Sequence, residues 1–99
     1  MSEGAKKSPL DTRVEAAEHV RCRRFDEDLV MVDLEGGEYF ALDAVGGRMW
    51  DLLVSGKTPA EVGAILVAEF EASEGEILHD CVRLVDDLLK RRLLVVRPQ

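Results

Sequence analysis

The stretch GEYFALDAVGGRMWDLL, residues 37–53, decides the fold of this chain. Residues 39–42 are strand-favouring or apolar types that suit a half-buried strand. Asp43 is a good helix N-cap, because its carboxylate can accept the free backbone N–H groups of the next turn. Apolar side chains then recur at helical spacing, with Trp50 beside them. The stretch therefore predicts a strand that leads directly into a helix at about residues 44–54, with a groove where an extended peptide can pair.

Two more strands are expected before this one, at residues 19–25 and 29–34. In the first, one side carries Val20, Cys22 and Arg24 and the other Arg21, Arg23 and Phe25, which suits an edge strand whose basic side chains discourage unwanted pairing. The second alternates too, so the three strands together form an antiparallel sheet. Because the connections are short, each strand should pair with its neighbour in sequence.

The loop before Tyr39 leaves two registers for the last hairpin. A two-residue loop would place Val32 opposite Ala41, whereas a three-residue loop places Val32 opposite Phe40. A slip of one residue turns every side chain to the other face, so burial of the apolar side chains favours the three-residue loop. In that loop Gly37 takes a positive φ at no steric cost.

Two capping signals follow the first helix. Gly56 should end that helix in a left-handed conformation, and Thr58-Pro59-Ala60-Glu61 is a capping box with proline at the first helical position. The second helix should then run to about residue 70. The pattern repeats at Ser73 and predicts a third helix at residues 74–91.

The third helix carries a wide apolar stripe, and we expect Trp50 to be buried against it near Val85 and Leu88. Residues 93–96 form a short apolar segment that is either packed in extended form or a small strand. Gly46 and Gly47, in the first helix, are expected to allow close packing rather than access to a ligand.

The fold class that these signals predict is α+β and winged-helix-like, with an N-terminal three-stranded antiparallel sheet followed by three helices. The chain has 99 residues, which suits one domain. We place that domain at residues 19–97, after a flexible tail at residues 1–18 with a short helical turn at residues 14–18.

Charge and composition exclude several classes of function. The net charge is −7, and residues 28–99 carry all of it. Phosphate contacts supply most nucleic-acid affinity, so we expect no nucleic-acid partner. No apolar run approaches the roughly 20 residues of a membrane span, and no secretory signal is visible, so we expect a cytoplasmic protein without a membrane partner.

The sequence offers no catalytic constellation, and we expect a protein that is not an enzyme and needs no cofactor or metal. A catalytic site needs a nucleophile, a base and a group that orients the base. Cys81 falls in the apolar stripe, where a small core residue is the natural interpretation. Cys22, His79 and Cys81 do not have the spacing of a metal site.

The run Y-F-A-L-D-x-x-G-x-x-x-W, residues 39–50, sits between a hairpin and two further helices. In this the chain resembles the PqqD family over roughly residues 20–95. The resemblance implies a small RiPP recognition element, which binds the leader segment of a ribosomally made precursor peptide. It also implies a second partner, a tailoring enzyme such as a radical enzyme, protease or cyclase, and leaves the pathway open. The alternative functions are a winged-helix transcriptional regulator and a protein-interaction adaptor.

The resemblance further implies that the leader adds as a strand to the free edge, with a pocket between that strand and the last helix. The matching strand positions are Glu38, Tyr39, Phe40, Ala41, Leu42 and Asp43. On the last helix we expect Leu78, Val82, Arg83, Val85, Asp86 and Leu89. The apolar members can equally be plain core, and the charged ones a solvated face. An exposed edge also permits self-pairing, so we expect a monomer or weak homodimer.

A gel-shift titration checks the exclusion of nucleic acid. With duplex DNA of mixed sequence at moderate salt, we expect no complex tighter than about 10⁻⁴ M, because an acidic surface repels phosphates. Retention of one specific sequence at lower protein concentration would contradict this and favour the transcriptional regulator.

Overall fold

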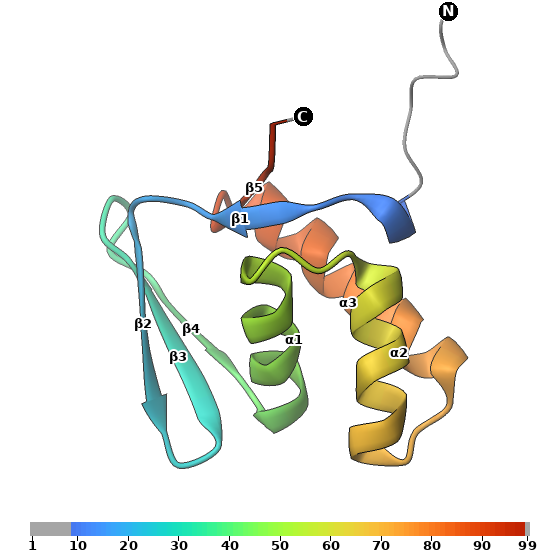
Figure 1. Ribbon diagram of the computed structural model, residues 1–99. Coiled ribbons are helices and arrows are strands. Elements are labelled where there is room, and N and C mark those ends of the chain that lie inside the picture. The colour runs from blue at the N-terminus through green and yellow to red at the C-terminus, as the bar shows by residue number, and fades with distance from the viewer. Residues whose placement is uncertain (1–8, 99) are drawn as a thin grey trace, which may run out of the picture.

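The computed structural model describes residues 9–98, which contain a three-stranded antiparallel sheet of order β2-β3-β4. Three helices follow this sheet in the chain, which confirms the predicted α+β class, and a second sheet joins β1 to β5. The elements in chain order are the 3-10 helix η2 (Pro9–Asp11), β1 (Val14–Ala16), β2 (Val20–Phe25), β3 (Asp28–Asp33), β4 (Tyr39–Leu42), α1 (Ala44–Val54), α2 (Pro59–Phe70), α3 (Glu74–Lys90) and β5 (Leu94–Val96) (Figure 1).

Helix α1 lies between the three-stranded sheet and the other two helices (Figure 1). Trp50 is only 4% exposed, so its predicted burial is confirmed. Toward the sheet, Gly47 allows close packing, because a Cβ there would lie 3.2 Å from the Cβ of Leu29 on β3. Arg24 of β2 forms an ion pair with Asp51 of α1. The helix is thereby fixed against the sheet by packing and by charge.

The β3–β4 hairpin has a register that neither expectation anticipated. Val32 lies opposite Tyr39. The expected pairing of Val32 with Phe40 is therefore wrong by one residue, and the two-residue alternative, with Ala41, is wrong by two. Residues 29–32 are all apolar, so burial alone did not determine which face of β3 turns inward. The structure buries the first and third of them and leaves the other two half-exposed.

The turn chemistry of Asp33 explains this register. Its carboxylate accepts the backbone N–H of Gly36 at 3.0 Å and that of Glu35 at 2.9 Å, and its carbonyl accepts the Gly37 N–H at 2.7 Å. The hydrogen bond from Gly36 is the main cause that lowers the pKa of Asp33. Gly37 has a φ of 73°, so its predicted positive φ is confirmed. The loop therefore has four residues, 34–37. Its length is set by the hydrogen bonds of the Asp33 side chain and not by the burial of apolar side chains.

Strands β1 and β5 bring both ends of the described chain together in the second sheet. Val14 on β1 is fully buried. The helical turn expected at residues 14–18 is therefore wrong, and Val14 belongs to the folded unit rather than to a tail of residues 1–18. Residues 1–8 of that expected tail lie outside the described residues. Of the two forms expected for residues 93–96, the small strand is the one found.

The helix ends follow the local sequence signals. At the start of α2 the Thr58 hydroxyl accepts the Glu61 N–H at 3.2 Å, and the Glu61 carboxylate accepts the Thr58 N–H at 2.9 Å. Gly56 has a φ of 110°, as expected after α1. The box expected at α3 forms only in part, because the Glu76 carboxylate accepts the Ser73 hydroxyl instead of its backbone N–H. These short-range signals set the helix bounds almost to the residue.

Gly37 and Gly75 offer a matched test of the hairpin, because a Cβ would meet no atom within 4 Å at either position. Gly37→Ala should lower the free energy of unfolding by about 1 kcal/mol, since alanine is strained at positive φ. Gly75→Ala, in the first turn of α3, should raise it by up to about 1 kcal/mol. Urea unfolding followed by Trp50 fluorescence measures both. Equal effects of the two changes would contradict the assigned turn.

Candidate functional site

The outer edge of β4 is free within the described part of the chain, because β4 is the last strand of its sheet. The Asp33 N–H donates to the Glu38 carbonyl at 2.9 Å, which makes this opposed pair a hydrogen-bonded one. Opposed residues in an antiparallel ladder alternate between bonded and non-bonded pairs. Phe40 therefore points its backbone groups toward β3, whereas Tyr39 and Ala41 point theirs outward.

The outward groups form a regular docking edge. Tyr39 and Ala41 each offer one N–H and one C=O, and the two residues lie roughly 7 Å apart along the strand. Both side chains are exposed, at 74% for Tyr39. An extended peptide repeats its own donors and acceptors at the same two-residue spacing. The sequence left the direction of these N–H groups open, and the register decides it.

Asp43 joins this edge directly to α1. Its carboxylate accepts the Gly46 N–H at 2.8 Å, and its carbonyl accepts the Gly47 N–H at 2.7 Å. Asp43 is therefore the single residue between the end of the strand and the start of the helix. No flexible linker separates the two elements. Gly46 lines the groove described below, whereas Gly47 packs on β3. The packing expectation is confirmed at both glycines, because a Cβ on Gly46 would lie 3.2 Å from the Cβ of Leu42 at the end of β4.

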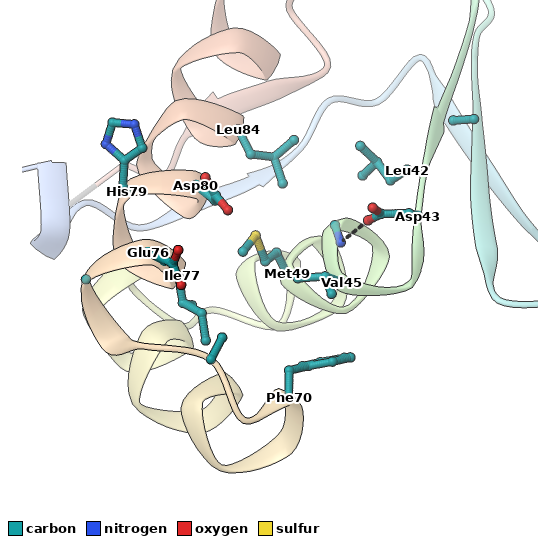
Figure 2. Close-up of a pocket in the computed structure, with 14 residues that line it drawn as sticks. Leu42, Asp43, Val45, Met49, Phe70, Glu76, Ile77, His79, Asp80 and Leu84 are labelled. Carbon is teal, nitrogen blue, oxygen red and sulfur yellow. Dashed lines mark hydrogen bonds between the residues drawn. The ribbon is translucent and has the colours of Figure 1, made fainter.

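A groove of about 1090 Å³ lies beside the end of β4, between α1, the end of α2 and the first half of α3. Figure 2 shows Leu84 on α3 directed toward Leu42 at the end of β4, with Met49 and Val45 of α1 below them in this view. Leu42 and Leu84 are half-buried, so apolar surface is open to a ligand. The wider lining is mostly apolar and adds Ala41, Val45, Gly46, Phe70, Ala72, Gly75 and Ile77 to three acidic residues and a histidine.

A second hollow of about 510 Å³ continues along α3 and shares Asp80 and Leu84 with the groove. Near this end of the helix the Arg91 guanidinium lies over the Phe40 ring, 4.7 Å from its centroid. Such a cation–π contact contributes about 0.5–1 kcal/mol at an exposed site. The contact links the middle of β4 to the residue that caps the end of α3.

The expected strand residues are divided between the groove, the outward edge of β4 and the hairpin. Ala41, Leu42 and Asp43 line the groove, and Tyr39 and Ala41 carry the outward backbone groups. Phe40 is half-buried and contacts Arg91 instead of the open groove. Glu38 precedes β4 and is used by the hairpin, because its carbonyl accepts the Asp33 N–H.

The expected helix residues are divided. Arg83 and Asp86 line the second hollow. Leu78 packs against α2, since a Cβ on Gly63 would lie 2.5 Å from its Cδ2 atom, and Val85 is 7% exposed in the core. The two remaining residues, Val82 and Leu89, are half-buried and line neither hollow.

The residues of α3 that line the groove differ from those expected for the peptide site. The helix turns Ile77, Asp80 and Leu84 toward the groove, and these recur at a spacing of three and four residues. The prediction from the sequence did not include these three residues, because the apolar stripe is wide and both of its margins carry charged neighbours. A signal was present, since Asp80 interrupts one margin of the stripe between two large apolar residues. Val45, Met49 and Phe70 were missed because only tertiary packing brings them beside β4.

Other chemistry is limited in the described residues. No group of three or more His, Cys, Asp or Glu side chains in residues 9–98 is placed to hold a metal ion. Burial raises the pKa of Cys81 to about 11, so its thiol is a poor nucleophile in the core. Cys22 is exposed, and its pKa is raised mainly by partial burial. Among the helices of this part of the chain, none has the length and apolar character needed to cross a membrane.

Comparison with known proteins gives two kinds of match. The model of the PqqD family, coenzyme PQQ synthesis protein D, matches residues 28–94, well over half of the chain. The structure of TbiB1 in complex with the TbiA(beta) leader peptide is similar, with 30% identity, 86% of this chain and 99% of that chain covered, and a TM-score of 0.76. Lasso peptide synthetase B1 complexed with the leader peptide shares the fold at 23% identity, with 84% and 98% covered and a TM-score of 0.77. No curated protein sequence matches the chain.

Amide hydrogen exchange measured by NMR tests the direction of the edge groups. The Tyr39 and Ala41 amides should exchange much faster than the Phe40 amide, because only Phe40 points toward β3. The neighbouring strand is the control, since β3 pairs on both sides and its amides should be protected without alternation. A slow Ala41 beside a fast Phe40 would contradict the register.

Proposed function

Because the chain belongs to the PqqD family, we propose that it binds the leader segment of a ribosomally made precursor peptide and presents it to a modifying enzyme. The protein itself catalyses no step in this proposal. The observation that carries it is the free edge of β4, which runs into a groove lined largely by apolar side chains. Two related structures hold leader peptides, which supports the same class of ligand here.

In the proposed complex the leader adds as a further strand of the sheet. Its backbone pairs with Tyr39 and Ala41, and alternate side chains enter the groove against Leu42 and Leu84. Burying two large apolar side chains contributes roughly 3–6 kcal/mol before the cost of ordering the peptide. A leader that is disordered when free loses much of that gain, so we expect a Kd near the micromolar range.

The charge of α3 favours peptide binding over a role as a transcriptional regulator. In a winged-helix regulator the recognition helix, which is the second helix of the helix-turn-helix, is basic, so that it can contact DNA phosphates. Here α3 carries five carboxylates against one arginine and one lysine. Two of those carboxylates pair with cations at the end of the helix, through the Asp86–Lys90 pair and through the pair of Asp87 with Arg91, the C-cap residue. The helix therefore suits a protein or peptide partner.

Ala41→Pro tests strand addition directly. The change removes an outward N–H and leaves the ladder with β3 intact, so the fold should be affected little. Binding of a labelled leader peptide from the cognate precursor should weaken about tenfold or more, measured by fluorescence anisotropy. Cys22→Pro is the matched control. Leu34 donates to the His19 carbonyl at 2.8 Å, so alternation along β2 turns the Cys22 N–H to the opposite free edge.

Leader binding should be unchanged in Cys22→Pro, and both variants should unfold at urea concentrations close to the wild type. Equal weakening by the two variants would attribute the loss to the fold rather than to pairing. Amide shifts that spare β4 and cluster on α2 when the leader is added would overturn the strand-addition mechanism.

A further inference from the structure

The groove beside β4 has an acidic lining. Asp43, Glu76 and Asp80 line it, and among the described residues no lysine or arginine does. His79 is the one other titratable group at the groove, and Figure 2 shows its ring directed away from the other labelled side chains. A peptide that enters this groove therefore meets a negative potential.

The three carboxylates differ in what they already bind. Asp43 accepts the Gly46 N–H at 2.8 Å, and Glu76 accepts the Ser73 hydroxyl at 3.2 Å. Asp80 forms no ion pair or hydrogen bond with any side chain of the described part of the chain. Asp43 and Glu76 each use one carboxylate oxygen in these bonds, whereas neither oxygen of Asp80 is engaged by a side chain of the described residues.

Asp80 also lies beside apolar surface at the junction of the two hollows. Asp80 and Leu84 line both of them and are one helical turn apart on α3. Figure 2 shows both side chains directed from α3 into the groove. This pairing of a carboxylate with an apolar neighbour suits a lysine or arginine, whose stem packs on apolar atoms while its charged end reaches the carboxylate.

We infer that this groove selects peptides in which a lysine or arginine lies close to an apolar anchor residue, and that Asp80 recognises the basic charge. The inference rests on the proposed function, because it assumes that a peptide adds to β4. The apolar anchor occupies the space between Leu42 and Leu84. The next inward-facing side chain, two residues along an extended peptide, then reaches Asp80. The backbone edge supplies affinity without regard to sequence, and Asp80 adds a preference for charge.

Selection from a library of random twelve-residue peptides tests this without a known leader. We would select mRNA-displayed peptides on the wild type, on Asp80→Asn and on Glu74→Gln. Glu74 is the matched control, since it is an exposed carboxylate on the same helix and lines neither hollow. Wild type and Glu74→Gln should both enrich lysine or arginine near a large apolar residue, and Asp80→Asn should not.

The affinities of one selected lysine-containing peptide for the wild type and the variants then measure how much the Asp80 charge contributes to binding. Asp80→Asn, or a lysine-to-glutamine change in the peptide, should each weaken binding about threefold to tenfold at low salt. The two losses should not add when combined. Asp80→Lys should prefer the lysine-to-glutamate peptide over the original one, which a merely structural role of Asp80 does not explain.

The outcomes separate this inference from the proposed function. If Ala41→Pro abolishes binding of the selected peptides but Asp80→Asn changes neither enrichment nor affinity, charge recognition is overturned and strand addition stands. If no peptide is enriched, or if the enriched peptides bind Ala41→Pro as tightly as the wild type, the proposed function fails and the inference fails with it.

Discussion

The cap at Asp43 is the constraint on which the rest of the structure depends. One residue ends β4 and starts α1, and its carboxylate and carbonyl accept the N–H groups of Gly46 and Gly47. The strand edge and the groove wall that α1 provides are therefore one rigid unit. Because Gly47 also packs on β3, the same junction fixes the helix against the sheet. A flexible connection here would leave the edge and the groove free to move apart, and a ligand would have to order both.

The sheet has two free edges in the described chain, and their chemistry differs. Strand β2 carries Arg21, Arg23 and Arg24, and such charges oppose pairing with another strand. Strand β4 is four residues long and has no charged side chain. An unpaired edge can pair with other chains and aggregate, and the short length of β4 limits such pairing. Of the two edges of this sheet, the edge of β4 therefore opposes pairing less, and it is the one beside the groove.

The acidic character of the chain has a local meaning as well as a general one. The net charge of −7, carried by residues 28–99, opposes nucleic-acid binding. On α3, ion pairs at a spacing of four residues engage Asp86 and Asp87, whereas Asp80 at the groove has no such pair among residues 9–98. In the proposed complex, the backbone edge of β4 accepts many sequences and the Asp80 carboxylate discriminates among them. Affinity and specificity then come from different parts of the same proposed site.

The sequence alone determined the features that neighbouring residues enforce. The three helices, the caps at Asp43 and Thr58 and the positive φ of Gly37 all follow from contacts within a few residues. The fold class and the family followed from the same local run.

Tertiary structure decided the hairpin register, the β1–β5 pairing and the face of α3 at the groove. Because residues 29–32 are all apolar, the sequence pattern allowed either face of β3 to be buried. The hydrogen bonds of the Asp33 turn then set the register. The wide apolar stripe of α3 similarly allowed two orientations, and packing of Leu78 on Gly63 selected the one that turns Asp80 and Leu84 to the groove. Local patterns specify which elements form, but packing between distant residues specifies which side of each element is left for a ligand.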